Sequence, residues 1–306
     1  MLQETLDRIE QNMREAPERG SVANYIPELA SIDPNQFAMS VCLADGQQVS
    51  CGDIDRVFSM QSVSKAFTLA MALGRFGDTL WARVGREPTN NSFNSVLDLE
   101  ATGGIPRNPF VNAGAIVVTD ALLAGRSPKE ALTEIKEFTR MAVGDDEDNI
   151  FINHEMARSE NVTGHRNWSL AHFLKSTNNL HHPCELTLGT YFHHCAIEMN
   201  CAQLARAGRF LAGFGDAHAM IAKRHVRSIN AVMMTCGHYD GSGEFAYRVG
   251  FPGKSGVSGG ILAIVPGVAS IAVWSPGLNN FGNSMLGSIA LEQLSLAMNW
   301  SVFDTK

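Results

Sequence analysis

Strand-like patterns lie near both ends of this chain, and mainly helical patterns fill the long stretch between them. Residues 37–53 favour two strands around Asp45-Gly46, a dipeptide typical of a β-hairpin. Three further segments that favour strands lie near the C-terminus, at residues 244–250, 256–266 and 268–276. The last two predict an antiparallel pair around Pro266-Gly267. We therefore expect one antiparallel sheet made from both chain ends, with a helical middle inserted.

Helices are expected on either side of the strand segments. The spacing of apolar residues predicts them over residues 2–15, 61–77, 127–143, 189–213, 229–237 and 284–300. The second of these helices should end at Gly74 or Gly77, because glycine commonly follows the last turn of a helix. Loops are expected at residues 103–110 and 144–149, which are rich in glycine, proline or acidic side chains.

The order of these segments predicts one interleaved domain over residues 1–306, of the α/β (α+β) class. An α/β part of about residues 1–60 and 225–306 surrounds a helical part of about residues 61–224. Hydrophobic residues make up 45% and charged residues 18% of the chain, which is typical of a folded globular protein.

Charge and targeting signals argue against several classes of partner. The formal net charge of -7 disfavours nucleic acid or an anionic membrane as the main partner. No signal or transit peptide is recognisable, and no run approaches the ~18–20 apolar residues of a membrane span. None of the six cysteines belongs to a Cys-x-x-Cys pair, so we expect buried, reduced thiols in a cytoplasmic protein.

Ser62 and Lys65 stand three residues apart at the start of a predicted apolar helix. Positions i and i+3 share a helix face, so the two side chains should point to the same side. Burial lowers the pKa of a lysine, and a neutral lysine can take the proton of a serine, which is otherwise a poor nucleophile. The pair predicts a nucleophilic site, with chance spacing or a capping role for Ser62 as alternatives. Ser64 has no lysine at this spacing and should face elsewhere.

A second polar segment places Lys254, Ser255 and Gly256 before an apolar strand. A glycine lets backbone or substrate approach closely, and the next amide N–H can face an oxyanion. The Gly-Lys-Ser triplet is not a phosphate loop, because that motif requires glycine where Arg248 stands and a helix afterwards. The segment therefore favours a nucleophilic site over a nucleotide site.

No metal site is predicted. The adjacent pairs His181-His182 and His193-His194 lack the i, i+4 spacing of a zinc-binding helix. The acidic residues 145–148 lack the spacing of an EF-hand and are expected to form a solvated loop.

Beyond these motifs, the chain resembles the bacterial glutaminase family over about residues 20–290. The segments that carry the resemblance, in the family's order, are residues 22–30, 58–67, 104–118, 159–167, 191–199, 236–266 and 273–284. The resemblance implies the fold of serine β-lactamases and penicillin-binding proteins. It also implies hydrolysis of L-glutamine to L-glutamate and ammonia through a serine acyl-enzyme, without a cofactor, in a homodimer or homotetramer.

The resemblance also implies roles for individual residues. Ser62 is the implied nucleophile and Lys65 its base, and the backbone amides of Ser62 and Val257 form the oxyanion hole. Besides Ser62 and Val257, the residues implied to bind glutamine are Tyr25, Asn112, Glu160, Asn167, Tyr191 and Tyr239. Glu160 suits the α-ammonium group, and Tyr191 or Tyr239 would relay a proton to the departing ammonia.

Each of these residues has an ordinary structural interpretation when it is considered alone. Asn112 and Asn167 suit helix caps, Glu160 a solvated loop, Tyr191 a helix core and Tyr239 a turn. Only their joint occurrence favours a substrate site. The alternatives are another acyl-serine hydrolase of the same fold, such as a β-lactamase or peptidase, an inactive amino-acid-binding protein, or a structural role.

Overall fold

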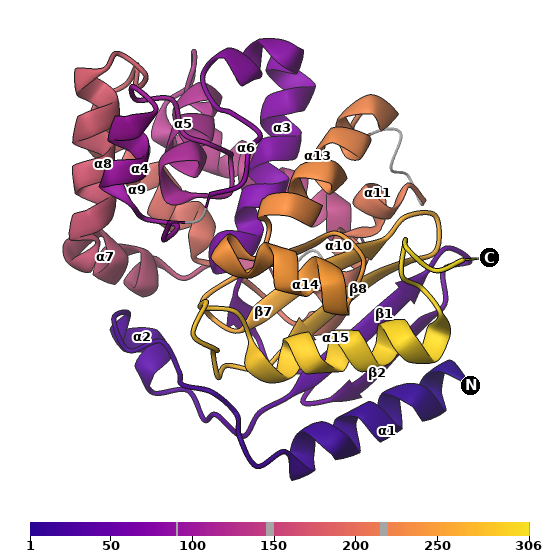
Figure 1. Ribbon diagram of the computed structural model, residues 1–306. Coiled ribbons are helices and arrows are strands. Elements are labelled where there is room, and N and C mark those ends of the chain that lie inside the picture. The colour runs from indigo at the N-terminus through magenta and orange to yellow at the C-terminus, as the bar shows by residue number, and fades with distance from the viewer. Residues whose placement is uncertain (90, 145–149, 215–219, 306) are drawn as a thin grey trace.

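The structure is a computed structural model that describes residues 1–89, 91–144, 150–214 and 220–305 (Figure 1). The acidic run at residues 145–148, predicted to be a solvated loop, lies outside these ranges. Within the ranges described, no helix is both long enough and apolar enough to cross a membrane.

Strands from both ends of the chain form one antiparallel sheet, which confirms the predicted architecture. Its strand order is β2-β1-β8-β7-β6, with the bounds Ala38–Leu43 (β1), Gln48–Gly52 (β2), Gly253–Ser255 (β6), Gly260–Val265 (β7) and Ala269–Trp274 (β8). Strand β1 pairs with β8 along its whole length, from Ala38 opposite Trp274 to Leu43 opposite Ala269. The β1–β2 hairpin and the β7–β8 pair lie where the sequence predicts them.

The two faces of the sheet bury different side chains, because successive residues of a strand point to opposite sides. In β1, Met39 and Val41 join the core with residues of the terminal helices α1 (Leu2–Glu15) and α15 (Met285–Met298). Figure 1 shows these two helices side by side across that face. Ala38 and Cys42 join the larger core on the other face, which includes the helical part of the chain.

The helices of the middle part are α3 (Ser64–Phe76), α4 (Val96–Ala101), α5 (Asn112–Leu122), α6 (Pro128–Val143), α7 (His154–Thr163), α8 (His165–Ser176), α9 (Cys184–Cys195), α10 (Cys201–Ala207) and α11 (Arg209–Ala212). They are preceded by α2 (Pro27–Ala30) and followed by α13 (Lys223–Cys236) and α14 (Ser242–Arg248). Helix α3 lies at the centre and packs against α5, α6, α9 and α13. A small sheet of order β3-β5-β4 links Phe58–Ser59, Ile197–Met199 and Phe151–Ile152.

Several local predictions are confirmed. Helices α1 and α15 lie where the apolar spacing predicts them. Helix α6 begins with a capping box, in which Ser127 and Glu130 each accept a hydrogen bond from the other's backbone amide. Helix α3 ends at Phe76, and Gly77 follows with a φ of +56°, so Gly77 is the correct stop and Gly74 is not.

Two predicted elements are wrong. Residues 244–250 alternate like a strand, but most of them lie in helix α14. Phe245 and Val249, four residues apart, are both buried there, and Tyr247 is 88% exposed. The helix predicted over residues 189–213 is interrupted by β5, because that segment pairs with both β3 and β4. Helix α10 then begins with its own capping box.

Candidate active site

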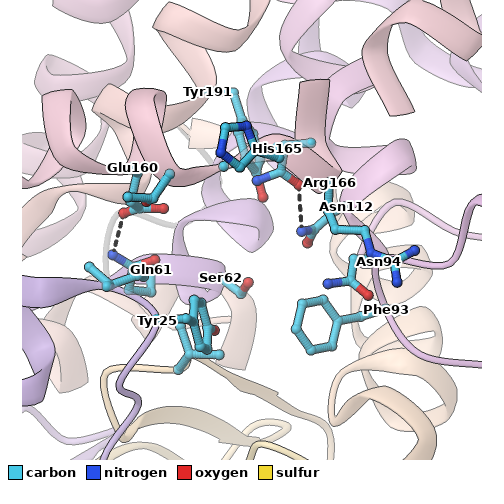
Figure 2. A pocket seen from close by; sticks show the side chains of 15 residues that line it. Tyr25, Gln61, Ser62, Phe93, Asn94, Asn112, Glu160, His165, Arg166 and Tyr191 are labelled. Atoms are coloured by element: carbon cyan, nitrogen blue, oxygen red, sulfur yellow. Dashed lines mark hydrogen bonds between the residues drawn. The ribbon is translucent and has the colours of Figure 1, made fainter. Parts of the chain in front are cut away.

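A cavity of about 410 Å³ lies where the helical part meets the loop between β6 and β7 (Figure 2). The predicted site residues that line it are Tyr25, Ser62, Asn112, Glu160, Asn167, Tyr191 and Val257. The other two lie behind its wall. Lys65 contacts Asn112, and Tyr239 packs on Phe93, and both of these partners line the cavity. The structure therefore brings all of the predicted site residues to one place.

Ser62 lies in the 3₁₀ turn Gln61–Val63 that leads into α3, and it is 7% exposed at the cavity wall. Gln61, just before it, has a φ of +47°, an uncommon conformation for a residue with a Cβ. The N-cap positions of the 3₁₀ turn and of α3 are Met60 and Val63, and Ser62 caps neither element. The capping interpretation of Ser62 is therefore wrong, and its hydroxyl remains available to the cavity.

Lys65 is buried in α3 behind Ser62. Its Nζ donates hydrogen bonds to the Phe110 carbonyl oxygen at 3.2 Å and to Asn112 Oδ1 at 2.7 Å. Burial lowers the pKa of Lys65 to about 8, against smaller opposing effects of Cys195 and Glu160. A substantial fraction of the lysine is therefore neutral near pH 8.

The backbone around Gly256 approaches Ser62 closely. A Cβ on Gly256 would lie 2.6 Å from the Met60 carbonyl oxygen and 3.4 Å from the Ser62 nitrogen, so only glycine fits without a shift. Among the described residues, neither the Ser62 amide nor the Val257 amide donates a hydrogen bond to the protein. Ser258 holds this loop in place through a 2.6 Å bond from its hydroxyl to the Ser59 carbonyl oxygen. The amides of Ser62 and of Val257, the residue after Gly256, are thus both without a protein acceptor in the described part of the chain, where these two segments approach each other.

Glu160 lies in α7 and is only 8% exposed, so it is not a solvated loop residue. Its Oε1 accepts a 2.7 Å hydrogen bond from Gln61 Nε2. Burial raises the pKa of Glu160, while the hydrogen bond from Gln61 and the charge of Lys65 act in the opposite direction. Burial has the larger effect, and the resulting pKa is about 7. A cation beside this carboxyl group would favour its ionised form.

Asn112 and Asn167 join two helices at the opposite side of the cavity. Asn112 Nδ2 donates to Asn167 Oδ1 at 2.8 Å, and Asn112 Oδ1 accepts from Lys65. The N-cap residues of α5 and α8 are Val111 and Gly164, so neither asparagine is a cap. With both amide oxygens already in use, the free groups of the pair are N–H donors.

The three tyrosines take different positions around the cavity. Tyr25 is 54% exposed at its mouth. Tyr191 is buried in α9, where burial raises its pKa well above the usual value, and its ring centroid lies 5.9 Å from Lys65 Nζ. Tyr239 has a φ of +57°. Burial raises its pKa, and hydrogen bonding to Ser62 and Ser255 opposes this rise, so that the resulting pKa is about 12. Of the three tyrosines, Tyr239 is the one whose pKa is affected by Ser62, and its hydroxyl donates a 3.5 Å hydrogen bond to the Ser255 carbonyl oxygen.

The histidine pairs and Lys254 serve the packing of the chain. His182 and its backbone amide bind the buried carboxylate of Asp120. His194 lies between the hydroxyls of Ser64 and Thr119, which places Ser64 away from the cavity. The described residues contain no group of three or more His, Cys, Asp or Glu side chains arranged to hold a metal ion. Lys254 is buried in β6 and donates to the Gly237 and Ser255 carbonyl oxygens.

The cavity also has lining residues that the sequence analysis missed. Gln61 directly precedes Ser62, and Arg166 directly precedes Asn167. Their position next to predicted site residues could have indicated that they line the cavity. Phe93 and Asn94 come from a segment without any catalytic pattern. The remaining lining residues that were missed are Ile26, Thr163, Gly164 and His165.

Comparison with known proteins gives a consistent result. The family model described as "Glutaminase" matches residues 20–303. The glutaminase of Mesorhizobium japonicum is 57% identical over 306 residues, covering 99% of this chain and 96% of that protein. The glutaminase of Pseudoalteromonas atlantica is 56% identical, covering 99% of both.

Solved structures agree with the sequence comparisons. A probable glutaminase from Bacillus subtilis is 33% identical with a TM-score of 0.87, covering 99% of this chain and 96% of that one. A probable glutaminase from Bacillus subtilis complexed with 6-diazo-5-oxo-L-norleucine is 32% identical with a TM-score of 0.85, covering 99% of this chain and 95% of that one. These neighbours have a β-lactamase-like fold, and this chain shares it.

Proposed function

This chain belongs to the glutaminase family, and we propose that it hydrolyses L-glutamine to L-glutamate and ammonia with Ser62 as the nucleophile. The observation that carries the mechanism is the position of the Ser62 hydroxyl. Ser62 lines the cavity, three residues before a buried lysine of lowered pKa, and the Ser62 and Val257 amides have no protein acceptor in the described part of the chain. A serine hydroxyl needs such a base and such donors to attack an amide.

Lys65 is proposed as the base that accepts the Ser62 proton. A neutral amine has two N–H groups, and the Phe110 carbonyl oxygen and Asn112 Oδ1 supply two acceptors for them. Its lone pair is then left for the proton of Ser62, one helical turn earlier. The same two acceptors hold the amine in a fixed orientation, which favours proton transfer.

The attack forms a bond from Ser62 Oγ to the side-chain amide carbon of glutamine. The amides of Ser62 and Val257 stabilise the oxyanion, an effect worth about 3 kcal/mol for one donor in other hydrolases. Tyr239 is proposed to carry the proton to the departing ammonia, because its hydroxyl interacts with Ser62. Neutral Lys65 then takes a proton from water as the water attacks the glutamyl ester. The ester C–O bond breaks, the proton returns to Ser62 Oγ, and L-glutamate is released.

The polar groups of the cavity suit the head group of a free amino acid. Glu160 can pair with the α-ammonium group, and Gln61 holds its carboxylate in position. The N–H donors of Asn112 and Asn167 suit the α-carboxylate. Tyr25 and Tyr191 are proposed to contact the remaining surface of the substrate at the mouth and the inner wall.

The pH dependence of glutamine hydrolysis tests this function. We expect equimolar glutamate and ammonia, with kcat rising from pH 6 through a midpoint near pH 8 as Lys65 becomes neutral. kcat/KM should fall more steeply below about pH 7, because Glu160 then loses the charge that binds the ammonium group. Steady-state assays from pH 6 to 9 measure both parameters, and a flat profile over that range contradicts the proposal.

The same assay separates the alternatives. Hydrolysis of a β-lactam in place of glutamine would indicate another acyl-serine hydrolase of this fold. Calorimetry that shows glutamine bound but not consumed would indicate an inactive binding protein. Within the described part of the chain, no observation favours either alternative over glutamine hydrolysis.

We further propose that residues 1–306 act as one domain in a cytoplasmic homodimer or homotetramer. The cavity takes Tyr25 and Val257 from the α/β part and Asn112 and Glu160 from the helical part, which supports a single functional unit. All six cysteines are free and buried, which agrees with a reducing compartment. The oligomeric state is implied by the family resemblance.

A further inference from the structure

The cavity lining carries two opposite charges on opposite sides. Figure 2 shows Glu160 beside Gln61 on one side and Arg166 beside Asn112 and Asn94 on the other, with Ser62 between them. Among the described lining residues, Glu160 is the only acidic side chain, and Arg166 is the only lysine or arginine. A free amino acid with its ammonium group at Glu160 would therefore have its carboxylate on the side of Arg166.

Arg166 is exposed at the start of α8, next to Asn167. Within the part of the chain that the structure describes, its guanidinium makes no ion pair or hydrogen bond, so it is available to a ligand. Other arginines close to the helical core have carboxylate partners, such as Arg83 with Asp120 and Arg107 with Asp98. The formal charge of the whole chain is -7, which disfavours the approach of an anion. A local cation in the cavity therefore helps an anionic group to bind.

Neutral donors distinguish a carboxylate from an amide less strongly than a cation does. The N–H groups of Asn112 and Asn167 can bind the carbonyl oxygen of either group, because both are hydrogen-bond acceptors. A guanidinium, in contrast, attracts the charged carboxylate more strongly than the neutral amide. A cation in the cavity therefore strengthens the discrimination between free glutamine and glutamine with a blocked carboxyl group.

We propose that Arg166 is a specificity-determining residue that recognises the α-carboxylate of free glutamine. It disfavours glutamine whose carboxyl group is bound in an amide or peptide. The inference rests on the proposed function, since it concerns the substrate of the same cavity. Because Arg166 is proposed to contact the α-carboxylate and not the side-chain amide that reacts, it should affect substrate binding and leave the chemical step unchanged.

The test compares two substrates and three variants. L-Glutamine is compared with L-glutaminamide, in which a neutral amide replaces the α-carboxylate. Arg166→Gln removes the charge, and Arg166→Lys keeps it. Arg158→Gln is the matched control, because Arg158 is an exposed arginine of α7 that does not line the cavity.

We expect Arg166→Gln to raise KM for L-glutamine about tenfold with kcat within about twofold, since it removes binding common to ground and transition states. Its kcat/KM for L-glutaminamide should remain within about twofold of wild type. Arg166→Lys should retain most of the affinity for L-glutamine, and Arg158→Gln should match wild type on both substrates.

Two results would overturn the inference. One is an equal loss on both substrates, which would mean that Arg166 maintains the shape of the cavity. The other is an unchanged KM of Arg166→Gln for L-glutamine. If wild type does not hydrolyse glutamine, the proposed function fails, yet calorimetry still tests Arg166. Binding of L-glutamate, and not of its α-amide, should weaken about tenfold in Arg166→Gln.

Discussion

Replacing Ser62 by alanine is expected to lower kcat for L-glutamine by about four orders of magnitude or more, as removal of a serine nucleophile does in other hydrolases. The loss follows because Ser62 is the only serine among the described residues that line the cavity. Ammonia release from the purified variant measures the effect. The variant should still bind L-glutamate in calorimetry, because Glu160, Asn112 and Asn167 remain in place.

Ser64→Ala is the matched control for this substitution. Ser64 lies two residues further along, and its hydroxyl contacts His194 and the Gln61 carbonyl oxygen outside the cavity. Its removal should keep kcat within about tenfold of wild type, since it affects only packing around α3. Activity of Ser62→Ala within tenfold of wild type would remove Ser62 from the nucleophilic role.

Replacing Lys65 by methionine is expected to lower kcat by about 10³-fold, within the range of a lost general base. The rise of kcat between pH 6 and 8 should disappear as well, because the group that titrates near pH 8 is gone. Methionine has a similar length and no charge to desolvate, so the folded state should not become less stable. Stopped assays across pH and thermal unfolding measure both effects.

The pH profile is the decisive part of this second result. A structural defect would lower kcat at every pH and leave the shape of the profile intact. A variant with reduced kcat but the same rise toward pH 8 would therefore assign the titration to another group, and Lys65 would lose its proposed role.

Local sequence patterns predicted the elements whose signals are local. The Asp45-Gly46 hairpin, the helix predicted over residues 127–143 and the Gly77 helix stop each depend on residues within a few positions. The helix α14 was missed because Phe245, Tyr247 and Val249 recur at the period of a strand, while Phe245 and Val249 alone also fit the period of a helix. Which period applies depends on the surface that covers the segment, and that surface comes from distant parts of the chain.

The candidate site shows the same contrast between features set by neighbouring residues and features set by distant ones. The spacing of Ser62 and Lys65 is fixed by one helical turn, so it was visible in the sequence. The contact of Gln61 with Glu160 joins residues 99 positions apart, and no local pattern reports it. Phe93 reaches the cavity from a loop and packs on Tyr239, which again depends on tertiary structure. The pKa shifts of Lys65 and Glu160 likewise depend on burial by residues from several helices.

The central claim is that the Ser62 hydroxyl forms the covalent intermediate, and labelling with 6-diazo-5-oxo-L-norleucine tests it most directly. This diazoketone analogue of glutamine should add once per chain, with loss of N₂, and peptide mapping by mass spectrometry should place the adduct on Ser62. The Ser62→Ala variant should remain unlabelled. An adduct on any other residue, such as Tyr239 or Cys195, or equal labelling of the variant, would contradict the account.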